Sequence, residues 1–121
     1  MWYMMSDDTS YQAYENLASE WRRGVLVLAV LAQCGEVQYG YSLKQQLSAA
    51  GLDINEGTLY PLLRRLEGQG LLASEWLVTE DRPRRYYKLS PAGKGVLEQL
   101  IKEWQDLVSV VARVLPEKEN H

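Results

Sequence analysis

The spacing of apolar residues changes twice along this chain of 121 residues, first close to Gly70 and again close to residue 91. Upstream of Gly70 the apolar residues recur every three or four positions, which is the period of a helix with a buried face. Downstream, residues 71–78 and 84–89 are rich in branched and aromatic side chains, which favour strands. A helical period returns from residue 91 onward. The pattern therefore predicts helices, then one β-hairpin, then a final helix.

Three helices are predicted ahead of the hairpin. Residues 17–34 can begin with Ser19 as N-cap, and their second half is apolar on all sides, as in a buried central helix. Residues 39–50 carry apolar side chains on one face, and residues 56–69 follow Asn55, a favourable N-cap. A pair of short helices behind a longer one is the order of a helix-turn-helix unit.

The two faces of the predicted 56–69 helix differ in chemistry. One face is a stripe of leucines with the spacing of a buried surface: Leu59, Leu62, Leu63 and Leu66. The opposite face carries Gly57, Thr58, Tyr60, Pro61, Arg64 and Arg65. Guanidinium groups bind guanine or phosphate, and a threonine can contact a thymine methyl group. This face is therefore a candidate for reading DNA, and the alternative is a helix whose two arginines are simply solvated.

The predicted hairpin is basic at its turn and on its return strand. Residues 79–83 (TEDRP) form the expected turn, and three arginines lie at it or just beyond it: Arg82, Arg84 and Arg85. Arginines on such a loop contact phosphates, which positions a protein on DNA without reading its sequence. The alternative is a hairpin that uses charge only to stay solvated. Tyr86 and Tyr87 must point to opposite faces of the strand, so one of them is expected to pack on the core.

The charges are unevenly distributed along the chain. The formal net charge is −3, yet residues 39–95 contain eight basic and six acidic side chains, which is a local net charge of +2. A basic patch on an acidic chain can still attract phosphate, because salt screens the distant charges. Helix-turn-helix followed by a basic hairpin is the order of a winged helix, in which the last of the three helices enters the major groove.

The chain resembles the PadR family of bacterial transcriptional regulators in four segments: RRGVLVLAVLA (22–32), YGYSL (39–43), EGTLYPLLRRLEGQGLL (56–72) and RRYYKLSPAG (84–93). The resemblance implies a mainly α fold with a small β-hairpin, namely a winged helix-turn-helix domain with a long C-terminal dimerisation helix. It also implies a homodimer that binds a pseudo-palindromic operator and usually represses the promoter. The helix at 56–69 would read the DNA, and residues 79–88 would be the wing.

The chemistry of these residues and the resemblance together define a set of predicted DNA contacts. The set consists of Tyr41, Lys44, Asn55, Thr58, Tyr60, Pro61, Arg64, Arg65, Arg82, Arg84 and Arg85. The alternative function is a protein-interaction module that keeps the winged-helix scaffold without binding DNA. Titration with DNA distinguishes the two hypotheses.

The last helix is predicted over residues 91–115. Ser90 is a suitable N-cap, Pro91 suits the first helical position, and Pro116 stops the helix. Its apolar residues follow the spacing of a coiled-coil seam, and the predicted dimer interface consists of Leu97, Leu100, Ile101, Trp104, Leu107, Val108 and Val111. A helix that protrudes from so small a domain needs a partner to cover this seam, and two-fold dimers are the commonest oligomer.

Two single residues each allow two interpretations. In some short PadR-like proteins a tryptophan on the last helix lines a pore between the subunits that binds flat aromatic compounds, so the resemblance implies a planar aromatic effector at Trp104. The alternative is that Trp104 only fills the dimer interface. Cys34 follows a buried helix and is expected to be a small core residue, with a redox sensor as the alternative.

Other classes of protein are disfavoured by the composition. The chain has one cysteine and one terminal histidine, so it offers no disulfide, no metal-ligand set and no histidine-based catalytic pair. The longest apolar run, residues 24–32, is too short to span a membrane. We therefore expect a cytoplasmic DNA-binding protein that uses no cofactor or metal and is not an enzyme.

The expected organisation has four parts. Residues 1–18 would be an N-terminal arm or a short extra helix, because they show no clear period. Residues 19–90 would form the DNA-binding domain and residues 91–115 the dimerisation helix. Residues 116–121 would be a frayed tail.

Overall fold

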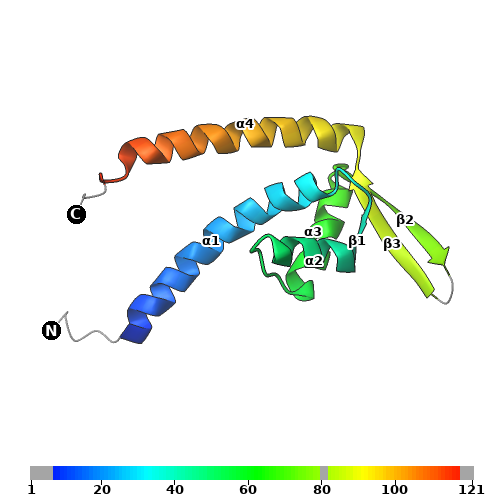
Figure 1. Ribbon diagram of the computed structural model, residues 1–121, viewed down its shortest axis with the longest axis horizontal. Coiled ribbons are helices and arrows are strands. Elements are labelled where there is room, and N and C mark those ends of the chain that lie inside the picture. The colour runs from blue at the N-terminus through cyan, green and yellow to red at the C-terminus, as the bar shows by residue number, and fades with distance from the viewer. Residues whose placement is uncertain (1–6, 80–81, 118–121) are drawn as a thin grey trace.

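The computed structural model describes residues 7–79 and 82–117 (Figure 1). Its elements, in chain order, are α1 (Asp7–Gln33), β1 (Gln38–Tyr39), α2 (Gly40–Ala49), α3 (Glu56–Gly68), β2 (Leu72–Thr79), β3 (Arg82–Leu89) and α4 (Pro91–Val114). The strands form one antiparallel sheet in the order β1-β3-β2. The predicted fold class, mainly α with a small β-hairpin, is confirmed.

The helix α3 forms where its local signals predict it. The Asn55 side chain accepts a hydrogen bond of 2.9 Å from the backbone N–H of Thr58, which satisfies one of the free donors of the first turn. All four leucines of the predicted stripe are buried. The chain leaves the helix through Gly70, whose φ of +78° is a conformation that glycine adopts without strain.

The core lies where the C-terminal half of α1, the helices α2 and α3 and the base of the sheet meet. Its fully buried side chains are Val30, Leu31, Cys34, Leu43, Leu47, Leu59, Leu63 and Leu66. Tyr87 is also buried and belongs to this core, whereas Tyr86 packs its ring against that of Tyr39. The expectation that one of these two neighbouring tyrosines would pack on the core is therefore confirmed.

The strand β1 is a feature that the sequence analysis did not predict. It has only two residues, and Gln38 and Tyr39 pair with Tyr87 and Tyr86 of β3. The buried Gln38 side chain holds the turn before α2, because its amide donates to the Gln46 side chain at 3.0 Å. So short a strand has no period along the sequence that could reveal it.

The hairpin is longer than expected. Strands β2 and β3 pair from Leu72 and Leu89 as far as Thr79 and Arg82. Pro83 therefore lies in β3 opposite Val78, and its predicted place in the turn was wrong. Since β1 pairs with β3 only near the base of the sheet, Pro83 has a strand on one side alone, and a proline is tolerated at such an edge.

The helix α1 begins much earlier than expected. It is continuous from Asp7, so Ser19 lies inside it and is not an N-cap. Residues 7–18 are the first part of α1 rather than a separate arm or short extra helix, while residues 1–6 lie outside the described residues. Because this part extends away from the core (Figure 1), most of its side chains are exposed and the sequence shows no buried stripe.

The helix α4 starts and ends close to its predicted limits. The Ser90 hydroxyl accepts a hydrogen bond of 2.9 Å from the Gly93 backbone N–H, which confirms the predicted cap. Gly93 is buried against the carbonyl oxygen of Leu71, where a side chain would clash. In Figure 1 α4 and α1 diverge as they extend away from the sheet. None of the helices in residues 7–79 and 82–117 has the length and apolar character of a membrane span.

Candidate nucleic-acid interface

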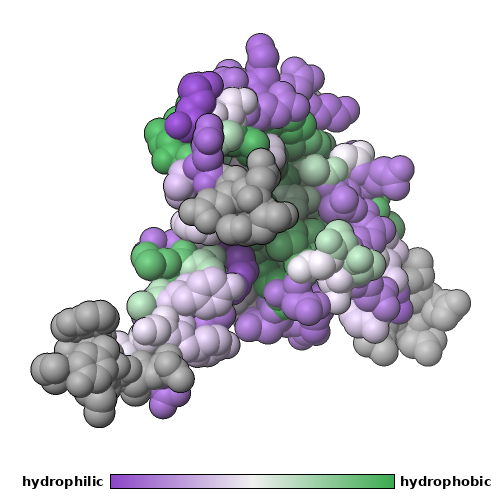
Figure 2. All heavy atoms as spheres, turned by 60° about the vertical axis from the view of Figure 1, so that its left-hand side comes forward, coloured by the Kyte–Doolittle hydropathy of each residue, from purple (hydrophilic) through white to green (hydrophobic). Residues whose placement is uncertain are grey.

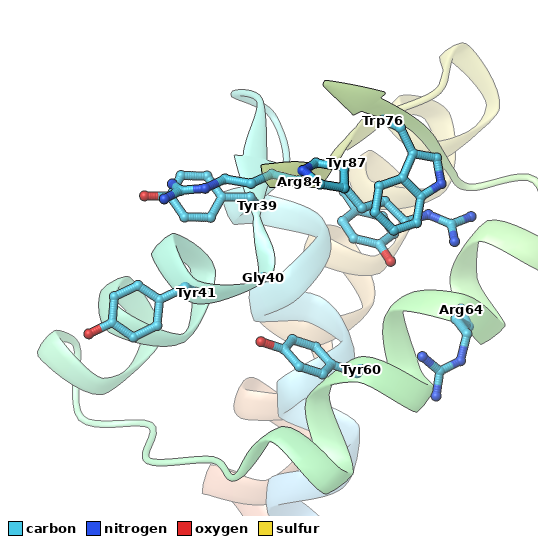
Figure 3. Close-up of a pocket in the computed structure, with 10 residues that line it drawn as sticks. Tyr39, Gly40, Tyr41, Tyr60, Arg64, Trp76, Arg84 and Tyr87 are labelled. Atoms are coloured by element: carbon cyan, nitrogen blue, oxygen red, sulfur yellow. The ribbon is translucent and has the colours of Figure 1, made fainter. Parts of the chain in front are cut away.

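A hollow of about 790 Å³ lies between α3, the start of α2 and the β2–β3 hairpin (Figure 3). Its lining residues are Tyr39, Gly40, Tyr41, Tyr60, Arg64, Trp76, Pro83, Arg84, Arg85 and Tyr87. The lining contains three arginines and five aromatic rings but no carboxylate. Two segments that were predicted separately, the 56–69 helix and the basic hairpin, thus form opposite walls of one hollow.

The wall made by α3 presents Arg64 and Tyr60. Arg64 is exposed, and Figure 3 shows its side chain extending from α3 along the lower edge of the hollow. The Tyr60 ring packs against Gly40, where a β-carbon would clash with the ring. Burial raises the pKa of Tyr60, and the nearby Glu56 carboxylate raises it further. The phenol therefore stays protonated and can donate a hydrogen bond.

The opposite wall presents Arg84. Its guanidinium carbon lies 5.0 Å from the centroid of the Tyr39 ring, which is the distance of a cation–π contact. Figure 3 shows the two side chains lying along one another at the top of the hollow. Within residues 7–79 and 82–117, no ion pair of Arg84 or Arg64 is found. Both guanidinium groups can therefore bind an added anion without first losing a carboxylate partner.

Arg85 has a different environment from its neighbour. Its guanidinium donates to the Glu67 carboxylate at 3.0 Å and to the Ser74 hydroxyl at 3.0 Å. The Ser74 hydroxyl in turn donates to the second oxygen of Glu67. Arg85 also lies near the rings of Trp76 and Tyr87, at 5.6 and 5.9 Å from their centroids. Arg85 is thus held from several sides.

The other predicted contacts on α2 and α3 do not line this hollow. Lys44 on α2 lies 3.8 Å from the Glu56 carboxylate, with both side chains partly exposed. The Asn55 side chain is already engaged as the cap of α3. Thr58, Pro61 and Arg65 are exposed on α3. The side chain of Arg82 lies outside the described residues.

Two arginines of α1 that were not among the predicted contacts lie near the start of α3. Arg22 and Arg23 line a second hollow of about 470 Å³ together with Asn55 and Thr58 at the start of α3. The sequence placed them in a helix but could not show that this helix passes the start of α3. Tyr39 and Trp76 were missed for the same reason, since only the folded chain brings them into the first hollow.

The predicted dimer residues on α4 fall into two groups. Leu97 and Leu100 are half-buried against the core of the same chain. The other five lie farther along α4, are exposed by between 39% and 49%, and are Ile101, Trp104, Leu107, Val108 and Val111. Figure 2 shows apolar surface in the crevice toward the free ends of α1 and α4. The described chain therefore leaves the distal part of the seam without a partner.

The thiol of Cys34 is fully buried in the core, and burial raises its pKa to about 12. A thiol in this state is neither nucleophilic nor easily oxidised, so the expectation of a core cysteine is confirmed. Among residues 7–79 and 82–117, no group of histidine, cysteine, aspartate and glutamate side chains is arranged to hold a metal ion.

Comparison with known families matches residues 27–99 to the transcriptional regulator PadR-like family. The chain belongs to this family. It is 38% identical over 93 residues to the transcriptional regulator Rv3488 of Mycobacterium tuberculosis, an alignment that covers 76% of this chain and 87% of that protein. The family resemblance found in the sequence is therefore confirmed.

Solved structures of PadR proteins have the same fold. A PadR family transcriptional regulator from Eggerthella lenta is 43% identical, with a TM-score of 0.79, and the match covers 88% of this chain and 99% of that one. A PadR-like transcription factor from Bacteroides fragilis is 36% identical, with a TM-score of 0.72 and coverage of 83% and 99%. The PadR-like chain is thus a winged-helix transcriptional regulator and not an enzyme, and its family implies regulation through DNA binding.

Proposed function

We propose that this PadR-like regulator represses transcription by binding a pseudo-palindromic operator as a homodimer. The helix α3 would enter the major groove, and the β2–β3 wing would lie on the backbone. The observation that carries the proposal is the hollow whose two walls hold Arg64 and Arg84, both free of ion pairs within the described residues. A regulator that acts on a bacterial chromosome works in the cytoplasm, which is the location that we propose.

The chemistry of the two walls suggests different tasks. Arg64 lies on the outward face of α3, where a guanidinium can pair with the edge of a guanine. Thr58, Tyr60 and Arg65 are its neighbours on the same helix. Arg84 lies on the wing, where a contact to phosphate sets position. Arg64 and Arg84, which have no ion pair within the described residues, favour the approach of a phosphate chain.

The apolar surface of the long helices supports a dimer. Exposed apolar side chains continue along α4 as far as Val114, which is 75% exposed. The free part of α1 adds a second stripe with Tyr11, Tyr14, Leu17 and Trp21, exposed by between 57% and 74%. Apolar surface exposed to this extent marks an interaction site. A second copy of the chain would cover it and would place two recognition helices about 34 Å apart, one turn of DNA.

A planar aromatic effector is the second part of the proposal. Trp104 is 45% exposed in the single chain and belongs to the seam that a second copy would cover, so an indole would line the junction. Flat aromatic molecules stack favourably on indole. Titration of the protein with a panel of planar compounds would quench tryptophan fluorescence if they bind here, and a Trp104→Phe variant would lose that response.

The decisive experiment is a fluorescence anisotropy titration with DNA from the protein's own promoter, at two salt concentrations, beside a scrambled duplex. The proposal predicts tight binding that prefers the promoter and weakens steeply with salt, because phosphate contacts release counterions. Arg64→Ala is expected to lose about 1–3 kcal/mol of binding free energy if Arg64 holds a base edge.

Lys102→Ala is the matched control, since it removes an exposed positive charge on α4, away from the hollow. Equal weak binding to both duplexes would place the operator elsewhere in the genome. No binding at low salt to any genomic fragment would contradict the proposal and favour a protein-interaction module.

A further inference from the structure

The two neighbouring arginines of the wing, Arg84 and Arg85, differ in what holds them. Arg84 is exposed and stacks on Tyr39, whereas Arg85 is only 36% exposed and is tied to Glu67 of α3. Both were predicted from the sequence as phosphate contacts. The difference between their environments leads to a different assignment for one of them.

We propose that Arg85 is a positioning residue. Arg85, Glu67 and Ser74 form a hydrogen-bonded tie between the wing and α3. This tie holds Arg84 where it meets the DNA backbone, and Arg85 itself does not bind phosphate. This inference rests on the proposed function, since it concerns how the same interface binds DNA.

The register of the sheet shows why Arg85 reaches α3. In β2 and β3 the pairs Leu72–Leu89, Ser74–Tyr87 and Trp76–Arg85 follow one another at alternate positions, so they share one face. At the base of this face Leu72 and Leu89 are buried in the core. Two pairs farther out, Arg85 meets Glu67, which is in the last turn of α3. Beyond the buried residues at its base, the wing is therefore fixed to α3 by the contact of Arg85 with Glu67.

The wing needs such an anchor because β1 supports only its base. Beyond the pairing of Tyr39 with Tyr86, the sheet consists of β2 and β3 alone. A two-stranded ribbon is only marginally stable by itself. Trp76 and Val78 are 61% and 76% exposed, so packing on the core does not hold this part of the hairpin.

The hydrogen bonds of the tie form a closed set. Both carboxylate oxygens of Glu67 are engaged, one by Arg85 and one by Ser74, and Ser74 also accepts from the Arg85 guanidinium. The pair is formally neutral, so it contributes little to the attraction of phosphate. Turning Arg85 toward DNA would leave the Glu67 carboxylate, which is only 27% exposed, without its cation and close to the phosphates.

Glu67→Gln separates the two roles because they predict opposite signs. If Arg85 binds phosphate, removing the negative charge beside it frees the guanidinium, and promoter DNA binds more tightly. If Arg85 positions the wing, the loss of the charged tie weakens binding, by about threefold or more. Glu75→Gln is the matched control, since Glu75 is an exposed carboxylate on β2, next to Ser74, with no ion pair to Arg85 among the described residues.

A double-mutant cycle with Arg84→Ala tests whether Arg85 acts through Arg84. In the Arg84→Ala background, Glu67→Gln and Arg85→Lys should cost much less affinity than in the wild-type protein, so the effects are not additive. If Glu67 and Arg85 served only the overall stability of the fold, their substitutions would cost the same affinity with or without Arg84, when affinities are calculated from the concentration of folded dimer. Additive losses, or an Arg85→Lys variant with wild-type affinity, would overturn the assignment.

Hydrogen exchange on the DNA-free protein completes the test. Glu67→Gln should speed the exchange of the wing amides in residues 82–87 and leave the exchange of the α3 amides unchanged. In the Glu75→Gln control the wing amides should exchange as slowly as in the wild type. Unchanged wing exchange would show that the tie does not hold the wing. A wild-type protein that binds no DNA would overturn the proposed function itself, whereas normal wild-type binding with unaltered Glu67→Gln affinity would overturn only the role of Arg85.

Discussion

The Tyr60 ring lies against the backbone of Gly40, at the start of α2. Any residue with a β-carbon at position 40 would push this ring away, so the pair shapes one wall of the hollow. The sequence indicated Tyr60 as a DNA contact because it is on the outward side of a helix with two arginines. It could not indicate Gly40 as its neighbour, because 20 positions along the chain separate the two residues.

The buried thiol of Cys34 predicts how stability depends on pH. Its pKa rises from an ordinary value of 9.0 to about 12 in the folded protein. A raised pKa stabilises the fold below the unfolded value and loses this effect as the pH rises toward the folded value. The free energy of unfolding should therefore fall above pH 9.0, with a slope that approaches about 1.4 kcal/mol per pH unit.

Urea denaturation at pH 7, 9 and 10 measures this slope. The Cys34→Ala variant is the control, since it removes the thiol, and it should show a clearly shallower fall between pH 9 and 10. Burial also raises the pKa of Tyr60 and of Tyr87, and because phenols begin to ionise in the same window, the difference between the two slopes measures the cysteine. An equal slope in Cys34→Ala would contradict the prediction.

At the scale of single elements, α3 depends most on local sequence. Its cap, its leucine stripe and the glycine beyond its end all lie within residues 55–70. Its predicted limits, 56–69, therefore differ from the observed Glu56–Gly68 by one residue. The wing was predicted as a hairpin for the same reason. Its length was underestimated, because a proline beside charged residues is typical of a turn, whereas Pro83 pairs with Val78 inside the hairpin.

The cap of α3 can be separated from its role in DNA binding by two substitutions of Asn55. Asn55→Ala removes the acceptor for the Thr58 N–H and should lower the free energy of unfolding by about 1 kcal/mol. Asn55→Asp keeps an acceptor and should retain most of this stability. Chemical denaturation measures both effects. If Asn55→Asp keeps the stability but loses affinity for promoter DNA, then position 55 lies close to the phosphates, which repel the new carboxylate.

The arrangement of the whole molecule is governed by two long helices that diverge. The free parts of α1 and α4 expose apolar side chains, among them Trp21 and Val114. The heptad spacing of α4 predicted such a seam. The first part of α1 was not predicted, because a helix that extends away from the core has no buried stripe in its sequence.

Charge placed in the α4 seam should separate the proposed dimer. Val111→Glu buries a carboxylate between the two subunits and is expected to halve the mass in light scattering, with a loss of operator affinity of more than about tenfold, since each subunit would then bind one half-site alone. Ser109→Glu is the matched control, because Ser109 lies on the exposed side of α4 opposite the heptad seam. A Val111→Glu variant that remains dimeric would contradict the α4 interface.

Features encoded within a few neighbouring residues could be derived from this chain without its structure. The caps of α3 and α4, the leucine stripe of α3, the basic hairpin and the family motifs are of this kind, because each follows from local backbone hydrogen bonding or from the burial of one face. The contacts of Arg85 with Glu67 and of Tyr60 with Gly40 could not be derived, and neither could the pairing of β1. These features join residues far apart in the chain, and only the packing of the core together with the register of the sheet determines which of them meet.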